Sequence, residues 1–446
     1  MKKFLNISLL SLLAISSLTF SSCKNEMEEI FDEDAVARLD KAKAEFIDIL
    51  TSNGGKWQME YYANSNEPGY VYLMTFRTDG SVTISGMNKW ISYVNGSSTP
   101  GAVAYGSQTS LWEVITDNGP VLSFNSYNKF FHIFADPEDI PSMSDEDTDE
   151  TGYGHEGDYE FDLMKYSNDT LYITGKKYGL DMIMTRVDPS YDDEVYMNEV
   201  VAMADSFFNA KIPQVYINLP NDVRWIVKNG ASSILKIFRE DADEISTAET
   251  HNVIITHDGL SFMNPITLDG YTIQSFIRQA DGSLLCRDDN QTTMTADPLS
   301  TVFVNKTLTW RLNVTDIGGV FANYITTLAD ELKAYNKSTL SYADMVYDAG
   351  LSKCVLTFYV KRSSTTFKPK FYFTMEPVGE TQIKFSFDPE GDAAGQTYAN
   401  RCPSMKAFVD EMGAHTFNLS SSSLLAPVNM KVADSSNASN YTVWGL

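Results

Sequence analysis

Apolar residues at every second position, in short runs separated by turn signals, constrain this chain more than any other feature. Trp57, Met59 and Tyr61 alternate with polar residues, and the segment 159–163 does the same. A period of two places one side of a strand against a core and the other side away from it. The Asn-Gly pair at 118–119 is typical of a tight hairpin between two such strands. The pattern therefore predicts antiparallel strands in sequence order.

The same pattern gives a domain organisation that is mainly β, with a few short helices. Residues 34–188 are expected to form a helix followed by an antiparallel meander of about eight to ten strands, which fits an up-and-down barrel better than a parallel sheet. Asp188 and Pro189 end that run. Residues 189–446 are expected to form a second β-rich domain. Its helices are predicted near 193–209, 321–335 and 403–412.

The N-terminus has the features of a secretory signal peptide over residues 1–22. Two lysines precede a mostly apolar stretch, which ends in Ser21, Ser22 and Cys23. Two small residues directly before a cysteine resemble the bacterial lipobox. That resemblance implies that Cys23 becomes the lipidated first residue of the mature chain and anchors it in outer-membrane lipid. No later segment has about 18 consecutive apolar residues, so no transmembrane helix is predicted.

Charge supports an extracellular setting and excludes one class of partner. The 59 acidic and 34 basic residues give a net charge of −25, so nucleic acid is not expected as a partner. Residues 23–33 form an acidic tether that resembles the export signal of Bacteroidetes-type surface lipoproteins. We therefore expect a protein anchored in the outer membrane and facing the cell exterior, with an ordinary solvated linker as the alternative reading of the tether.

The search for catalytic motifs gives no catalytic residue. The sequence contains no HExxH, GxSxG or P-loop motif and no GxGxxG that opens a helix. Many acidic residues leave a glycosidase-type carboxylate pair open, although no spacing argues for one. His132 alternates with phenylalanines and is expected to be a buried barrel residue. The three remaining cysteines, Cys286, Cys354 and Cys402, allow at most one disulfide.

One acidic segment has the spacing of a calcium loop. Asp145, Asp147, Asp149 and Glu156 stand at positions one, three, five and twelve, the side-chain ligand positions of EF-hand loops. Position six is Glu150 where an EF-hand has glycine, and no helix is predicted on either side. These residues predict a weak calcium site, with a solvated acidic loop as the alternative. No other cofactor is expected.

Two resemblances extend this interpretation. Gly55-Lys56-Trp57, after a helix and at the start of the first strand, resembles the opening of lipocalin-like (calycin) barrels. In that family a late arginine packs across the tryptophan near the closed end of the barrel. The resemblance implies a lipocalin-like first domain and a structural pair of Trp57 and Arg186. The alternative is a tryptophan that merely begins a β domain.

The wider resemblance is to the Bacteroidetes surface lipoprotein family known as domain of unknown function 4302. The matching stretches are YVYLMTFRTDGSV, GPVLSFNSYNKFFHIFADP and GYGHEGDYEFDLMKYSNDTLYITGKKYGLDMIMTRV, together with residues 55–62. The family offers no catalytic residues to transfer. It implies a setting similar to that of accessory binding proteins in outer-membrane nutrient uptake.

The function expected from these observations is non-catalytic binding of a glycan or of an uptake-system protein at the cell surface. The 24 tyrosines and 6 tryptophans are compatible with sugar stacking, although such residues also fill β cores. The alternatives are a hydrolase acting on surface polymers and a structural partner in a surface complex.

Overall fold

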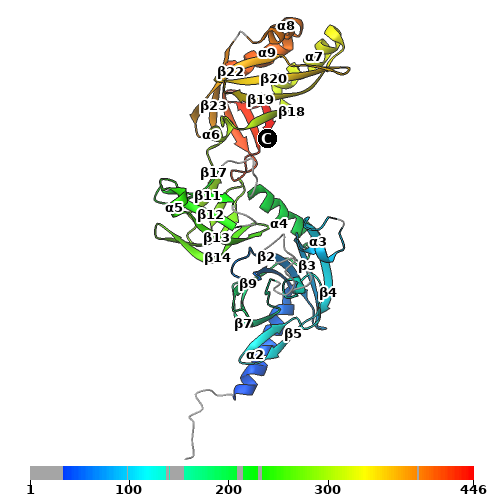
Figure 1. Ribbon diagram of the computed structural model, residues 1–446, viewed down its shortest axis with the longest axis vertical. Helices are drawn as coiled ribbons and strands as arrows, with labels where there is room; N and C mark the ends of the chain where they lie inside the picture. The colour runs from blue at the N-terminus through cyan, green and yellow to red at the C-terminus, as the bar shows by residue number, and fades with distance from the viewer. Residues whose placement is uncertain are drawn as a thin grey trace, which may run out of the picture.

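The period-two segments form the strands of three successive antiparallel sheets in the computed structural model, stacked along the long axis of the molecule (Figure 1). The structure describes residues 34–97, 99–136, 140, 155–207, 214–229, 234–388 and 391–446. The mainly β, antiparallel fold class is confirmed. Within the described residues, no helix is both long enough and apolar enough to cross a membrane.

The first sheet, called the first barrel here, follows helix α2 (Ala35–Thr51). Its nine strands run in the order β4-β3-β2-β1-β9-β8-β7-β6-β5. The edge strands β4 and β5 are separated in sequence by Trp112 alone, so the sheet curls until its two edges meet at that residue. The strands are β1 (Lys56–Tyr61), β2 (Tyr70–Phe76), β3 (Ser81–Asn88), β4 (Ala104–Leu111), β5 (Glu113–Thr116), β6 (Pro120–Ser123), β7 (Glu160–Ser167), β8 (Thr170–Gly175) and β9 (Asp181–Arg186), with short helices α3 (Ile91–Val94) and η2 (His132–Phe134) between them.

Helix α4 (Asp193–Phe207) leaves the first barrel and leads into the second, which is a closed barrel of eight strands. The strands are β10 (Val215–Asn218), β11 (Arg224–Asn229), β12 (Ile234–Arg239), β13 (Glu249–Thr256), β14 (Gly259–Leu268), β15 (Tyr271–Arg278), β16 (Leu284–Cys286) and β17 (Thr293–Ala296), with α5 (Glu244–Thr247) between β12 and β13. Each strand pairs with its sequence neighbours, and β10 pairs with β17 to close the ring.

The third sheet begins after α6 (Leu299–Phe303) and is called the third barrel. Its nine strands run in the order β19-β18-β26-β25-β24-β23-β22-β20-β21. An additional pairing joins β19 to β20, the last strand but one, so eight of the nine strands form a closed ring. The strands are β18 (Thr309–Gly318), β19 (Thr339–Asp348), β20 (Lys353–Arg362), β21 (Thr365–Phe367), β22 (Lys370–Gly379), β23 (Gln382–Asp388), β24 (Thr416–Ser421), β25 (Asn429–Asp434) and β26 (Tyr441–Gly445). Helices α7 (Gly319–Asn336), α8 (Ala393–Arg401) and α9 (Pro403–Ala414) pack against this sheet.

The domain organisation differs from the sequence prediction in one respect. A single β-rich domain was expected over 189–446, but this region contains two separate sheets. Only Asp297 and Pro298 lie between β17 and α6, so no long linker marks the boundary. The helices predicted near 193–209, 321–335 and 403–412 are present as α4, α7 and α9.

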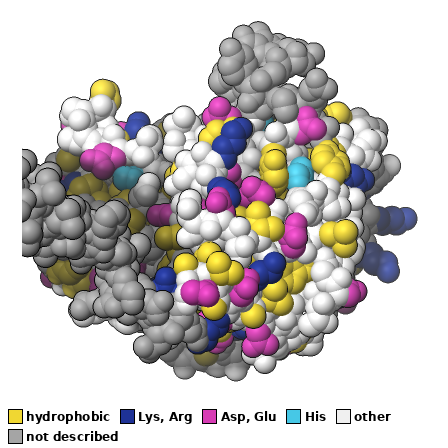
Figure 2. Space-filling view, turned by 90° about the horizontal axis from the view of Figure 1, so that it is seen from below, with side chains coloured by type: hydrophobic (Ala, Val, Ile, Leu, Met, Phe, Trp, Pro, Cys, Tyr) yellow, Lys and Arg dark blue, Asp and Glu magenta, His cyan; other side chains and the backbone are white. Residues whose placement is uncertain are grey.

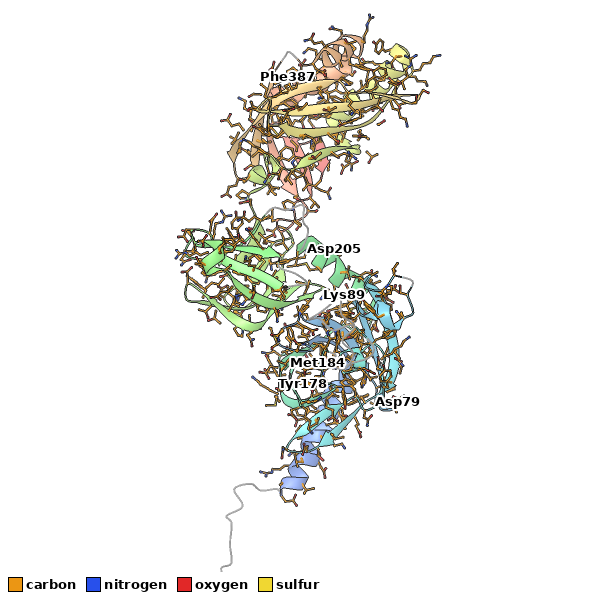
Figure 3. All side chains as sticks on the ribbon, viewed as in Figure 1. Asp79, Lys89, Tyr178, Met184, Asp205 and Phe387 are labelled. Carbon is orange, nitrogen blue, oxygen red and sulfur yellow. The ribbon has the colours of Figure 1, made fainter. Side chains whose placement is uncertain are left out.

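Among the described residues, each sheet has one large hydrophobic core, and the second barrel has a further small cluster of Tyr216, Ile226 and Phe238. Trp57 and Met184 belong to the first large core, Phe262 to the second, and Trp310 and Phe385 to the third. Figure 3 labels Met184 within the first barrel, Asp205 near the end of α4 and Phe387 in the third barrel. On the face of the molecule seen in Figure 2, basic side chains lie singly or in small groups among acidic and hydrophobic ones.

Candidate functional site

A cleft of about 1200 Å³ lies between the first and second barrels. The first barrel lines it with the outward faces of β1, β8 and β9, and the second barrel lines it with residues of β14 and β15 and the β13–β14 turn. Residues of the segment 187–196, which includes the start of α4, complete the wall. We call this space the inter-barrel cleft.

Strand alternation explains why β1 presents polar groups to the cleft. Trp57, Met59 and Tyr61 point into the first core, so Gln58 and Glu60 point outward. An outward residue of a lone barrel would be solvated. Here every residue of β1 is buried. On its outer face, Tyr196 of α4 bonds to Gln58, and Ser261 of the second barrel bonds to Glu60. The docking of two barrels has therefore buried polar side chains that strand periodicity assigns to solvent.

Glu60 is the most perturbed carboxyl group in the cleft. It is only 6% exposed, and burial raises the pKa of its side chain to about 7. A hydrogen bond with Ser261 and the charge of Arg287 act against this rise, whereas the charge of Asp258 adds to it. Glu60 can thus hold or release a proton near neutral pH.

The other polar groups of the cleft form two short networks. The Tyr196 hydroxyl donates to Gln58 Oε1 over 2.6 Å, and Gln58 Nε2 lies 3.5 Å from Glu60 Oε1. On the second barrel, Asp258 accepts a hydrogen bond from Thr256 at 2.9 Å and pairs with Arg287 at 3.0 Å. The networks fix the positions of two carboxyl groups, one from each barrel.

Two buried polar atoms of the cleft lining have no hydrogen-bond partner among the described residues. They are the Tyr62 hydroxyl oxygen and His257 Nδ1. The His257 ring packs against the Tyr196 ring at a tilt of 33°, with centroids 4.3 Å apart. Its Nδ1 is 3.6 Å from the nearest oxygen of Asp258, beyond hydrogen-bond distance. A buried polar atom without a partner costs free energy, so each of these atoms is a place where a ligand hydroxyl or a water can bind.

The rest of the cleft lining combines hydroxyl and amide groups with aromatic rings. Tyr172 on β8 is 42% exposed, and Gln274, Thr174 and Thr185 also line the cleft. An exposed ring next to many donors and acceptors suits a ligand with both apolar faces and hydroxyl groups.

The structure brings together the predicted pair of Trp57 and Arg186. The Arg186 guanidinium carbon lies 4.2 Å from the centre of the tryptophan ring, and the two residues are paired across β1 and β9. Arg186 also donates to the carbonyl oxygens of Ile49 and Ser52, at 2.7 and 3.0 Å. The indole Nε1 donates to the carbonyl of Leu50 at 2.9 Å. Arg186 thus joins the end of α2 to the last strand, although it also lines one edge of the cleft.

Other predicted site residues lie partly or wholly outside the described residues. Cys23 lies there, as do three of the four proposed calcium ligands, Asp145, Asp147 and Asp149. The fourth, Glu156, is exposed and has a positive φ of 57°. Lipidation and calcium binding therefore stay predictions.

One histidine, His132, and the three described cysteines are buried in the protein interior. His132 is buried, its ring nitrogens lie near the carbonyls of Phe124 and Asn128, and burial lowers its pKa. Three cysteines are buried and unpaired in the structure: Cys286, Cys354 and Cys402. Burial raises the pKa of each of these thiols to about 11, so they are not activated nucleophiles.

Comparison with known proteins gives a family and distant structural matches. The family model described as "Domain of unknown function (DUF4302)" matches residues 27–280. This range includes the first barrel and every cleft residue named above except Arg287. The search of curated proteins found no match.

Solved structures align over most of the chain, but at very low scores. The β subunit of DNA polymerase from Streptococcus pyogenes is 10% identical, with 91% of this chain and 97% of that chain covered and a TM-score of 0.13. The β subunit of DNA polymerase III from Thermotoga maritima is 9% identical, with the same coverage and a TM-score of 0.14. Isotype 1 transferrin-binding protein B from serogroup B Neisseria meningitidis is 8% identical over 87% of this chain and 75% of that chain, with a TM-score of 0.14. Scores this low do not indicate a shared fold.

Proposed function

Because the chain belongs to the family described as domain of unknown function DUF4302, whose description gives no activity, we propose a function from the chain's own residues. The protein is a non-catalytic lipoprotein of the cell surface that binds a glycan in the inter-barrel cleft, as an accessory component of an outer-membrane nutrient-uptake system. The observation on which this proposal depends is the cleft itself, with two buried polar atoms, Tyr62 Oη and His257 Nδ1, that lack partners among the described residues.

The chemistry of the cleft fits a polyhydroxylated ligand. Sugar hydroxyls both donate and accept hydrogen bonds. They can therefore pair with the Tyr62 hydroxyl, and with His257 Nδ1 whether or not that nitrogen carries a hydrogen. The exposed ring of Tyr172 offers an apolar face of the kind on which a sugar ring stacks. A volume of about 1200 Å³ accommodates several sugar units.

The surface location is supported by the N-terminal sequence. The signal peptide ends directly before Cys23, and lipidation of this cysteine would hold the mature chain at the outer membrane. The net charge of −25 argues against nucleic acid as a partner. Replacing Cys23 with Ser should release the protein from membranes, and an unchanged membrane fraction that still incorporates labelled palmitate would contradict the anchor.

Glycan binding can be tested on the purified protein with native affinity electrophoresis against a panel of neutral and acidic polysaccharides, followed by calorimetry on fragments of any that retard it. Tyr172→Ala should weaken binding about tenfold, because it removes the stacking ring. Tyr335→Ala is the matched control, since Tyr335 is also exposed (39%) but lies on α7 of the third barrel. Retardation by no polysaccharide, or an equal loss in both variants, would refute the cleft as a glycan site.

A second function has one observation in its favour. Glu60 and Asp258 line the same cleft, and a glycosidase uses two carboxyl groups, one of which has a pKa near 7 and acts as a general acid, as the pKa of Glu60 would allow. A surface hydrolase would release new reducing ends from a bound polysaccharide, and Glu60→Gln would abolish that release while leaving binding intact. Binding with no release in either protein identifies the non-catalytic function.

A further inference from the structure

We propose that Glu411, His415 and Asp434 form a binding site for one divalent transition-metal ion of the zinc type. The site lies in the third barrel, outside the residues matched by the family model and apart from the inter-barrel cleft. It does not depend on the proposed glycan binding.

The fold brings these residues together from two elements. Glu411 lies in the last turn of α9, and His415 follows the end of that helix, so the two are one turn apart. Asp434 is the last residue of β25 and pairs with Phe417 at the beginning of β24. Because β24 starts directly after His415, the strand pairing places Asp434 beside the imidazole.

The distances between the possible ligand atoms suit a small ion. One ligand atom from each residue lies within 4.8 Å of the others. His415 Nε2 is 3.4 Å from Glu411 Oε1, and His415 Nδ1 is 3.5 Å from Asp434 Oδ2. Two ligands of a tetrahedral zinc ion, each bound at about 2.0–2.1 Å, are separated by about 3.4 Å. The two carboxylates face different ring nitrogens, and one ion binds an imidazole through one nitrogen only. Glu411 therefore has to turn toward the nitrogen that faces Asp434 before all three residues can bind the same ion.

Asp434 is held for this role by the residues that follow it. Its Oδ1 accepts hydrogen bonds from the backbone N–H and from the hydroxyl of Ser436, both at 2.8 Å. The second oxygen, Oδ2, is the one that faces His415. A ligand carboxylate fixed through its other oxygen is the usual outer-shell arrangement at a metal site.

The exposure and chemistry of the cluster favour a transition metal. The side chain of Asp434 is 3% exposed, whereas those of Glu411 and His415 are partly exposed, so an ion can enter from solvent and keep water in its remaining positions. One imidazole nitrogen with two carboxylate oxygens is a ligand set for zinc and similar ions, whereas calcium and magnesium prefer oxygen ligands throughout. Bound there, the ion would connect the end of α9 to the β24–β25 hairpin.

A protonated imidazole between two carboxylates would explain the same distances without a metal, so the experiment must distinguish the two. The full chain without a polyhistidine tag is first freed of metal with a chelator and then dialysed against zinc or magnesium chloride at pH 7.5. We expect the chain to bind one zinc ion, and Asp434→Asn and His415→Gln should each lower the affinity for zinc at least tenfold. Asp434→Asn retains the oxygen that accepts from Ser436, which limits its effect on folding. His251→Gln is the matched control, because His251 lies 3.6 Å from a single carboxylate, that of Glu249.

Melting provides a second measurement of the same ion. At a free zinc concentration about 100 times the dissociation constant, the melting midpoint of the third barrel should rise by about 9 °C, and His415→Gln should abolish the rise. Ser436→Ala should weaken zinc binding about tenfold through Asp434 alone. The proposal is overturned if no zinc binds, if zinc binding is equal in wild type and both ligand variants, or if magnesium occupies the same residues as tightly as zinc.

Discussion

The two joints between the three barrels differ in one respect, because the first contains the inter-barrel cleft and the second does not. The first joint, between the first and second barrels, contains the inter-barrel cleft, which is lined by side chains such as Gln58, Glu60 and Tyr196. Among residues that do not line the cleft, Gly69 N–H donates to the carbonyl of Val253 at 3.2 Å, and Ile254 of β13 belongs to the core of the first barrel. The second joint, between the second and third barrels, lies apart from the cleft and includes backbone hydrogen bonds. There Ala296 N–H donates to the carbonyl of Leu424 at 2.8 Å, and Leu424 N–H donates to the carbonyl of Asp281 at 2.9 Å.

An apolar residue completes the second joint. Leu425, in the segment between β24 and β25 of the third barrel, is 1% exposed and belongs to the core cluster of the second barrel. Backbone hydrogen bonds and an inserted leucine can be replaced only by equivalent groups, whereas side-chain contacts beside a cavity can be exchanged for contacts with a ligand. Both joints therefore hold two barrels together, and the first differs because it also contains a cleft, so we expect ligand binding at the first joint.

The largest effect is expected at the second joint. Leu425→Ala should lower the free energy of unfolding of the second barrel by about 2–5 kcal/mol, because it leaves a cavity in that core. Hydrogen–deuterium exchange of the backbone amides of β16 and β17 measures this loss of stability within the second barrel. Leu351→Ala is the control, since that leucine is 50% exposed and should change stability little. A loss below about 1 kcal/mol would mean that Leu425 is not a structural part of the joint.

At the first joint, the buried carboxyl group makes stability depend on pH. Glu60 keeps its proton in the folded protein up to a pKa of about 7, against an ordinary value of 4.5. Between these two values the folded state binds more protons than the unfolded state, so stability falls as pH rises and the loss is complete above about pH 7. The difference corresponds to about 3 kcal/mol at most.

Glu60→Gln tests this dependence because the amide mimics the protonated acid and cannot ionise. The variant should match wild type near pH 4.5 and be more stable by up to about 3 kcal/mol at pH 8, as measured by urea unfolding at both pH values. Glu376→Gln, at an exposed position of β22, controls for the loss of one charge. If wild type and Glu60→Gln differ equally at both pH values, the carboxyl group is not buried at the joint.

Sequence reasoning succeeded where contacts are local or follow strand register. The alternation of Trp57, Met59 and Tyr61 gave β1 and its core face, and the expected contact of Trp57 with Arg186 is present at 4.2 Å. Trp310 repeats part of this arrangement, since its Nε1 donates to the carbonyl seven residues earlier, as Trp57 does. The residues before Trp310 are Leu308 and Thr309, whereas Gly55 and Lys56 precede Trp57. Because the glycine is missing, the sequence does not indicate that a third barrel begins there.

The cleft could not be predicted because its residues become a site only when two barrels dock. Gln58 and Glu60 occupy outward positions of a strand, which the period-two pattern assigns to solvent. Asp258 lies in a turn about 200 positions later, and nothing local relates it to β1. The signals available were the polar outer face of β1 and the segment 191–199, rich in tyrosine and acidic residues, which includes the start of α4.

A smaller effect is expected from a glycine at the second joint. Gly282 has φ of +77°, and a Cβ added to it would lie 2.5 Å from the Ser423 Cα. Gly282→Ala should therefore cost about 2 kcal/mol, part from the left-handed conformation and part from the backbone contact. Gly270→Ala, where φ is +89° and the space is open, isolates the first contribution. Equal costs for the two variants would mean that the backbones of the two barrels are not in contact at Gly282.

The smallest effect is expected from Tyr196→Phe at the first joint, where a bound ligand can replace a lost hydrogen bond. Tyr196→Phe removes the hydroxyl that donates to Gln58 at 2.6 Å but keeps the ring packed against His257, with centroids 4.3 Å apart. The variant should lose about 1 kcal/mol of stability, because the Gln58 oxygen is left unpaired in a buried place. A bound ligand that donates to this oxygen would recover part of the loss, so the destabilisation should shrink when a binding polysaccharide fragment is present. Tyr191→Phe, which loses a bond to Glu199 within the same segment, should show no such recovery, and a recovery in both variants would place the ligand elsewhere.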